Sequence, residues 1–280
     1  MRWVRELQRL RKQRLPGVLV TVLDVRGHAP REAGAKMVVS AAGQAGSIGG
    51  GNLEQSALVA AREMITSGAT APSTRTFGLT EHASTRHGVQ CCGGEVTVLF
   101  EPLRPAPAVA IFGLGHVGVE LARLLARHDV ELHLVDSREG YLAADRLAPM
   151  VADAEADVHL HPAVLPELAL GELPAGCHVL IMTHDHAEDA ALCDAALRCI
   201  ASSADHLGLI GLIGSTAKWR RIARRLAAEG HSDAALARIT CPIGLPGLPG
   251  KAPATIAVSV AADLLARFAE RTEHAEVTRD

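Results

Sequence analysis

The chain of 280 residues has few aromatic side chains, no excess of basic charge and no long apolar run. Phe, Trp and Tyr make up 2% of the sequence, so it lacks the stacking platform with which proteins bind exposed bases. Lys and Arg number 28 against 31 Asp and Glu, so no basic surface for nucleic acid is predicted. No apolar stretch approaches the ~20 residues that a bilayer crossing needs. We therefore expect neither nucleic acid nor a membrane among its partners.

Several catalytic motifs are also missing. The sequence has no Walker loop, no nucleophile elbow and no HExxH zinc motif. Its six cysteines occur without the composition of a small disulfide scaffold, which favours a reducing compartment. The segment from Met1 to Leu7 is charged and amphipathic and lacks the apolar core of a secretion signal. Together these features predict a cytoplasmic protein.

The length and a change of pattern near residue 105 predict two domains. Residues 1–104 have the pattern of a small α/β domain, and a proline-rich linker is predicted over 101–107. The expected elements of this domain are a helix over 3–14, strands over 18–25, 37–39 and 96–100, a helix over 52–67 and a loop over 68–76.

From residue 108 on, strand and helix patterns alternate, which is typical of a parallel, doubly wound sheet. Strands are expected over 109–112, 131–135, 178–182 and 207–213, and helices over 117–127, 187–200, 216–229 and 254–271. The predicted fold class is therefore α/β, with the small N-terminal α/β domain followed by a Rossmann-like domain over residues 108–271. Residues 272–280 are expected to form a frayed polar tail.

A dinucleotide-type fingerprint opens the second domain. Gly113, Gly115 and Gly118 directly follow a predicted strand and begin a helix, as the phosphate-binding turn requires. Asp136 ends the next strand, where an acid suits a ribose 2′-hydroxyl, and Arg138 leaves a 2′-phosphate possible. The pattern predicts a Rossmann-like fold, but fold alone does not establish that NAD(P) or another nucleotide binds.

Two further glycine-rich segments lie at predicted helix starts. Gly49, Gly50 and Gly51 form either a plain turn or a backbone nest for an anion such as a phosphate, and we favour the nest. Gly214 and Ser215 end a predicted strand before a basic helix, and ligands of open α/β sheets bind at the carboxyl ends of strands. Both segments are candidate cofactor-binding sites.

The sequence Gln-Cys-Cys-Gly-Gly over residues 90–94 brings two adjacent thiols next to two glycines. Cys91 and Cys92 are poorly placed for a disulfide with each other and lack the spacing of a zinc clip. They are either buried structural cysteines or soft ligands, with Gly93 allowing a bulky group to approach the backbone. A zinc site with His82 and His87 matches no standard module.

Residues 183–186 read Thr-His-Asp-His at the end of a predicted strand. They suggest either a metal or acid–base cluster or, more commonly, a helix cap.

Taken together, these motifs resemble the xanthine dehydrogenase accessory proteins, the XdhC branch of the XdhC/CoxI group. The matching segments are residues 28–31, 34–37, 46–51 with Leu53 and Glu54, 90–94, 112–118, 135–138, 211–215 with Lys218, 241–244 and 256–259. They occur in the right order over about residues 18–265, and the double cysteine resembles the XdhC branch. The sequence departs from the family over residues 251–256, where Thr255 stands in place of the usual glutamate, and at residues 85–89.

The resemblance implies a function that the residues alone do not identify. Such proteins bind the molybdenum cofactor (molybdopterin), protect it from oxidation and aid its sulfuration together with a cysteine desulfurase. They then help to insert it into xanthine dehydrogenase, and they are expected to form homodimers. On this basis a pterin phosphate would bind at Gly49–Gly51, and Cys91 or Cys92 would contact molybdenum.

Two other functions remain open. An NAD(P)-dependent oxidoreductase would need a general acid or base, for which His184 and Lys218 are the candidates. A nucleotide-gated assembly factor would bind a dinucleotide in the Rossmann domain and perform no chemistry. A non-catalytic maturation factor is the leading hypothesis.

Overall fold

The computed structural model describes residues 1–79, 94–203, 206–248 and 250–277, with the backbone alone for 270–277. It divides into two compact units, one of residues 1–106 together with the chain from Ala269 on, the other of residues 107–268. The first boundary falls inside the proline-rich stretch of the sequence. Among the described helices, none has both the length and the apolar character of a membrane span.

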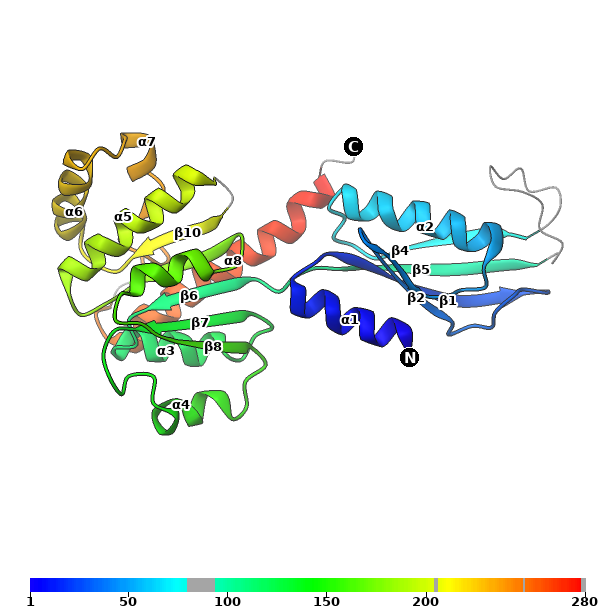
Figure 1. Cartoon of the computed structure of the whole chain (residues 1–280), viewed down its shortest axis with the longest axis horizontal. Coiled ribbons are helices and arrows are strands. Elements are labelled where there is room, and N and C mark those ends of the chain that lie inside the picture. The colour runs from blue at the N-terminus through cyan, green and yellow to red at the C-terminus, as the bar shows by residue number, and fades with distance from the viewer. Residues whose placement is uncertain (80–93, 204–205, 249, 278–280) are drawn as a thin grey trace. The chain divides into compact units, whose positions relative to one another are not determined.

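The first unit is built on a five-stranded sheet in the order β3-β2-β1-β5-β4, in which all neighbours are antiparallel (Figure 1). Its strands are β1 (Gly17–Arg26), β2 (Lys36–Ser40), β3 (Gly43–Gly46), β4 (Ser73–Gly78) and β5 (Glu95–Leu103). Alternate residues of β1, namely Val18, Val20 and Val22, join a buried core with side chains of the second helix. The period of two in β1 therefore sets which face of the sheet is buried against this helix.

Two helices pack on this sheet, on opposite faces (Figure 1). α1 (Arg2–Gln13) is amphipathic and ends at Arg14, whose φ of 52° is left-handed. Trp3 of α1 lies beside Gly46, where an added Cβ would be 3.3 Å from the Trp3 side chain. α2 (Gly51–Thr66) covers the other face with a row of small and apolar residues that includes Leu53 and Ala57.

The loop predicted over residues 68–76 is wrong, because Ser73–Gly78 form β4. This strand is polar and largely exposed, so its sequence lacks an apolar pattern, and its pairing with β5 stabilises it. β5 also extends into the predicted linker, to Leu103. Pro102 is tolerated there because β4 ends its pairing at Phe100, which leaves β5 an edge strand on that side.

The second unit is a six-stranded parallel sheet in the order β11-β10-β9-β6-β7-β8. Its strands are β6 (Ala108–Phe112), β7 (Glu131–Asp136), β8 (Asp157–Pro162), β9 (Cys177–Ile181), β10 (Leu207–Leu212) and β11 (Ile239–Thr240). Numbered within the unit, the order is 3-2-1-4-5-6, the arrangement of a doubly wound Rossmann sheet. The predicted α/β fold class, with a Rossmann-like second domain, is confirmed.

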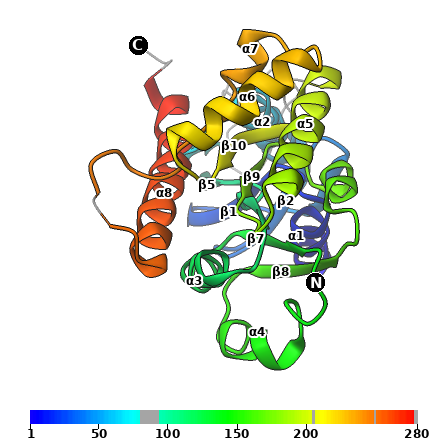
Figure 2. The same cartoon turned by 90° about the vertical axis from the view of Figure 1, so that its left-hand side faces the viewer.

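Helices cover both faces of this sheet (Figure 2). On one face lie α3 (His116–Leu125) and α8 (Pro253–Val277), and on the other α5 (His186–Ser202) and α6 (Thr216–Ala228). Trp219 of α6 packs against the core on the α5 side. Because the inner strands are covered on both faces, they are largely apolar, as in β6, where all five residues are buried.

The sequence analysis missed the shorter elements of this unit. They are α4 (Ala144–Val151), β8, the 3₁₀ helix η1 (Pro166–Glu172), α7 (Asp233–Leu236) and β11. Strand β8 alternates polar with apolar residues and lies at the sheet edge, so it gives no buried-strand signal. The predicted polar tail is also corrected, because α8 continues to Val277 through residues without Gly or Pro to end it.

Candidate functional site

In the first unit, three segments singled out by the sequence meet beside the end of β1. The turn after β1 holds Pro30 and Arg31, and the glycine run precedes α2. Gly49 has a φ of +131°, and a Cβ there would lie 2.8 Å from the Pro30 side chain. Only glycine lets the two turns pack this closely, so Gly49 joins them structurally.

The two residues that flank the cysteine-containing segment, Leu79 and Gly94, are hydrogen-bonded to each other. The Leu79 N–H donates to the carbonyl of Gly94 (2.7 Å), which closes the chain around residues 80–93. A Cβ on Gly94 would collide with the carbonyl oxygens of His28 and Arg26. Cys91, Cys92 and Gly93, like His82 and His87, lie outside the described residues. Both ends of their segment, however, are fixed next to the turn that follows β1.

The glycine nest already holds an anion of its own, the carboxylate of Glu54. The backbone N–H groups of Ile48 and Gly50 donate to Glu54 Oε2 at 3.1 and 3.0 Å, and Ser47 Oγ donates to the same oxygen at 2.5 Å. Gln44 Nε2 donates to Oε1 at 2.7 Å. Burial alone would raise the pKa of Glu54, but these hydrogen bonds outweigh it and hold the pKa below its usual value.

Two donors of the predicted phosphate nest are therefore used within the chain. Gly50 and Gly51 both have positive φ, and a Cβ on Gly50 would meet nothing within 4 Å, so this side of the turn is open. A phosphate could approach the open side, but the N–H groups of Ile48 and Gly50 point to Glu54. Phosphate binding at Gly49–Gly51 remains a prediction.

In the second unit, the fingerprint glycines have the geometry that the motif requires. Gly113 has a φ of +105°, and a Cβ there would lie 2.5 Å from the carbonyl oxygen of Met182. A Cβ on Gly118 would collide with the Gly113 carbonyl, so this glycine permits close packing of helix on strand. A Cβ on Gly115 would meet nothing within 4 Å, which leaves the backbone open to a ligand.

Asp136 is hydrogen-bonded within the chain, and its contact with a ribose stays a prediction. It is 4% exposed, and its Oδ2 accepts from Leu114 N at 2.6 Å and from Arg138 Nη2 at 2.8 Å. Its Oδ1 accepts from Arg138 N at 3.0 Å and Nε at 2.9 Å. Burial would raise the pKa of Asp136, but the hydrogen bonds from Arg138 and Leu114 lower it. The four lone-pair sites of the carboxylate are thus occupied, and none is left for a ribose hydroxyl.

Basic side chains gather next to this carboxylate. The Arg138 guanidinium lies 3.4 Å from the centroid of the Tyr141 ring, and that of Arg146 lies 4.2 Å from it. Arg146 Nη2 also donates to the carbonyl of Leu114 at 2.8 Å, within the glycine turn. The guanidinium groups of Arg138 and Arg146 place positive charge beside the turn, although Asp136 and Glu188 both act on Arg138.

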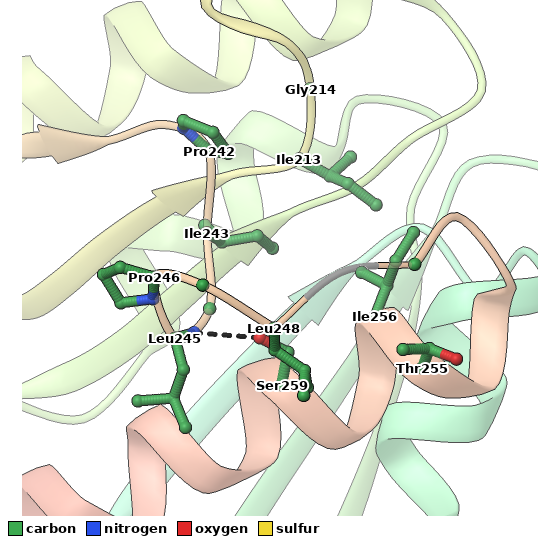
Figure 3. Close-up of a pocket in the computed structure, with 13 residues that line it drawn as sticks. Ile213, Gly214, Pro242, Ile243, Leu245, Pro246, Leu248, Thr255, Ile256 and Ser259 are labelled. Carbon is green, nitrogen blue, oxygen red and sulfur yellow. Dashed lines mark hydrogen bonds between the residues drawn. The ribbon is translucent and has the colours of Figure 1, made fainter.

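At the carboxyl ends of β10 and β11 lies a cavity of about 500 Å³ (Figure 3). It is lined by Ile213, Gly214, the segment 242–248 and residues of α8 that include Ile256 and Ser259. The Ser259 hydroxyl accepts a hydrogen bond from Leu245 N at 2.9 Å. The structure therefore brings together three segments that the sequence analysis had matched separately. Ser215 is not part of the lining and caps α6 through Lys218 N at 3.3 Å.

Lys218 is held in a buried ion pair. Its Nζ lies 2.5 Å from Asp189 Oδ2 and 2.9 Å from the carbonyl of Ile213. Asp189 is fully buried and also accepts from the Thr183 hydroxyl at 2.9 Å. The network joins the ends of β9 and β10 to α5 and α6, which is a structural role and not that of a free general base.

The Thr-His-Asp-His segment is a helix cap. Asp185 Oδ1 accepts from Ala187 N at 2.6 Å at the start of α5. His184 is exposed.

Burial disfavours the thiolate form of three described cysteines. Burial raises the pKa of Cys193 to about 12, and it raises the pKa of Cys199 and Cys241 as well. Cys177 is fully buried, and its thiol donates to the carbonyl of His178. The soft-ligand chemistry expected from the sequence therefore depends on Cys91 and Cys92.

One cluster of possible ligands was missed by sequence reasoning. Glu131, His133 and His159 place their donor atoms within 4.8 Å of one another on β7 and β8. The available signal was a His-Leu-His sequence at residues 159–161, because alternate residues of a strand point to one face. It was overlooked because β8 was not predicted.

Two family models match the chain. The model described as the XdhC Rossmann domain matches residues 109–264, and that described as the XdhC and CoxI family matches residues 10–78. A curated relative is YqeB of Escherichia coli strain K12, an uncharacterized protein that is 26% identical over 265 residues. The match covers 93% of this chain and 45% of YqeB, so the chain spans about half the length of this relative.

Two solved structures are similar in part. A xanthine dehydrogenase from Bacillus halodurans has 19% identity and a TM-score of 0.47, with 97% of each chain covered. The Escherichia coli tRNA N6-threonylcarbamoyladenosine dehydratase TcdA has 16% identity and a TM-score of 0.42, covering 60% of this chain and 88% of the other. Likeness at this level does not carry an activity from one protein to another.

Proposed function

Because the chain belongs to the XdhC family, we propose that it serves in the maturation of xanthine dehydrogenase by binding the molybdenum cofactor. In this role it holds the cofactor, protects it from oxidation and presents it to a cysteine desulfurase for sulfuration. It then passes the cofactor to xanthine dehydrogenase and is not a subunit of the final enzyme. We further propose that it acts in the cytoplasm and as a homodimer.

The observation that carries this proposal is the meeting of segments beside the end of β1. The chain that holds Cys91 and Cys92 leaves at Leu79 and returns at Gly94, against the backbone of His28. The turn that begins there also packs on the glycine run before α2. We expect a cofactor contacted by the thiols to bind beside Gly94, near the turn at His28 and the glycine run.

The residues present fit the cofactor in chemistry. A cysteine thiolate is a soft ligand that suits molybdenum or its sulfido group, and the described cysteines are held protonated by burial. The glycine nest supports the proposal less strongly, because Glu54 uses two of its N–H groups. The proposal therefore rests on the thiols, with the open side of Gly50 as the expected place of the pterin phosphate.

The thiols give the first prediction. Purified protein is incubated with molybdenum cofactor and passed through gel filtration, and the protein peak is analysed for molybdenum and pterin. We expect stoichiometric co-elution with the wild type, reduced retention in Cys91→Ala and Cys92→Ala, and nearly none in the double variant. Cys199→Ala, a partly buried cysteine on α5, serves as the control and should retain the cofactor fully. Equal molybdenum retention in the double variant and the wild type would rule out the thiols as ligands.

A second candidate function is that of a nucleotide-sensing assembly factor. The specific observation in its favour is the open backbone at Gly115 together with the positive charge of Arg138 and Arg146. Since Asp136 has no acceptor site left, a nucleotide with a 2′-phosphate fits better than one with a free 2′-hydroxyl.

Calorimetry separates this candidate from an oxidoreductase. We expect NADPH to bind at least tenfold more tightly than NADH, and Arg138→Ala to reduce that preference. Tighter binding of NADH would contradict the charge argument. Turnover of the nicotinamide with a substrate would favour an oxidoreductase, for which Lys218, paired with Asp189, offers no free base.

A further inference from the structure

Four titratable side chains lie together on one face of the parallel sheet, at its β7–β8 edge. Glu131 and His133 are two residues apart on β7, and His159 and His161 are two apart on β8. The strands pair in register, with His133 opposite His159. This is the face covered by η1, because Val135, two residues beyond His133, packs in the same core as Leu170.

The spacing of three of these side chains matches metal coordination. His133 Nε2 lies 3.2 Å and His159 Nε2 3.5 Å from the same oxygen, Glu131 Oε1. All three donor atoms lie within 4.8 Å of one another. Tetrahedral Zn²⁺ with bonds of about 2.0–2.2 Å requires ligand atoms about 3.4 Å apart. The carboxylate oxygen already stands at that distance from both nitrogens.

A buried nitrogen without a hydrogen bond points independently to a ligand. His133 is 5% exposed, and its Nε2 is fully buried with no hydrogen-bond partner. Its near neighbour is Glu131 Oε1, at the ion-pair distance of 3.2 Å. Leaving a polar atom buried and unsatisfied costs free energy, and such atoms in a native fold call for an explanation. A metal ion at the centre of the cluster would supply the missing partner.

The other nitrogen of His133 faces a second histidine, His161. His133 Nδ1 lies 2.9 Å from His161 Nε2, and His161 Nδ1 lies 4.0 Å from Glu172 Oε2. If Glu172 attracts the Nδ1 proton of His161, then His161 Nε2 accepts from His133 Nδ1. This order leaves the lone pair of His133 Nε2 directed at the cluster. Hydrogen bonds of this kind fix the tautomer of metal-binding histidines.

We propose that Glu131, His133 and His159 form a binding site for a divalent transition metal of the Zn²⁺ type, with His161 as a positioning residue. A water molecule completes the coordination, and the His159 side chain, 48% exposed, lies on the path of entry from solvent. Two nitrogen donors select against Mg²⁺ and Ca²⁺, which take oxygen ligands.

The site is separate from the ligand crevice of the Rossmann sheet. Glu131 is the first residue of β7, whereas Gly113 and Gly214 follow the carboxyl ends of their strands. In this proposal the ion has a structural role, because it links the edge strand β8 to β7. It does not depend on the proposed role in cofactor binding.

The test uses the full chain without a histidine tag, freed of metal by a chelator. Calorimetry with Zn²⁺ and metal analysis after gel filtration are expected to show one ion per chain, with no binding of Mg²⁺. His159→Ala, at a half-exposed edge position, should fold normally by circular dichroism and weaken Zn²⁺ binding by more than about 100-fold. His161→Ala should weaken it by about 10- to 100-fold. His128→Ala, an exposed histidine between α3 and β7, is the matched control and should bind like the wild type.

Two further measurements keep the proposal falsifiable if a variant misfolds. Co²⁺ bound to the wild type should give the intense visible absorption of a four-coordinate site, and Zn²⁺ should raise the melting temperature of the wild type but not of Glu131→Gln. Zn²⁺ uptake that is absent from the wild type, or is equal in the wild type and His159→Ala, overturns the site.

Discussion

At the scale of single residues, Glu54 shows how a side chain of the protein can take the place that a motif suggests for a ligand. Three glycines before a helix predict an anion site, and an anion is indeed there, but it is the carboxylate of the fourth residue of α2. The same holds for Asp136, whose position predicts a ribose contact and whose bonds go to Leu114 and Arg138. Sequence identifies where such donors gather, but which acceptor they take depends on side-chain geometry.

This gives a prediction for Glu54. The folded-state pKa of Glu54 lies below its ordinary value of 4.5, so the ionised form stabilises the fold above that pH, and this contribution is lost as the pH falls through the folded pKa. Glu54→Gln should lower the free energy of unfolding of the first unit by about 1–2 kcal/mol at pH 7. The difference from the wild type should shrink below about pH 4.5.

Urea unfolding followed by circular dichroism at pH 7 and pH 4 measures both effects. Glu63→Gln is the control, because Glu63 lies on the same helix with a side chain 64% exposed and only a distant ion pair to Arg75. A deficit in Glu54→Gln that is equally large at both pH values would contradict the role assigned to the carboxylate.

At the scale of elements, the hairpin of β4 and β5 determines where the cysteine segment is held. Gly94, directly before β5, lies against the carbonyls of Arg26 and His28, where no side chain fits. Gly94→Ala should therefore destabilise the first unit by about 1–3 kcal/mol and reduce retention of molybdenum cofactor. Thermal unfolding and the co-elution assay measure the two effects.

Gly78, the last residue of β4 and the partner of Glu95 in β5, provides the control for this change. A Cβ on Gly78 would meet nothing within 4 Å, so Gly78→Ala should leave both stability and retention close to wild type. If the two alanine variants behaved alike, the close packing of Gly94 would not be what positions the segment.

The elements that sequence predicts best are those whose pattern comes from burial. β6 and β9 are buried throughout and were predicted within one residue of their observed bounds. β4 and β8 were missed because both lie at sheet edges and alternate or expose polar residues. Their strand conformation depends on a neighbour that is distant in sequence, and local composition carries no sign of it. The histidine cluster was missed for the same reason, since half of it lies on β8.

At the scale of the whole molecule, sequence predicted the fold class and the order of the large elements. The classical strand order of the second unit follows from alternating strands and helices with right-handed crossovers. The grouping of the last part of α8 with the first unit could not be predicted, because it depends on contacts between segments far apart in sequence. The coming together of Gly214, residues 242–248 and α8 around one cavity likewise requires the three-dimensional fold.

The chain contains two tryptophans, and each unit holds one of them, Trp3 on α1 and Trp219 on α6. Intrinsic fluorescence can therefore be assigned to one half of the protein at a time. Trp219→Phe would leave emission from the first unit alone, for which cofactor binding is proposed. Trp3→Phe would leave emission from the second unit, the Rossmann-like one. Quenching by a coloured pterin or by bound Co²⁺ would then report optically which half has taken up which ligand.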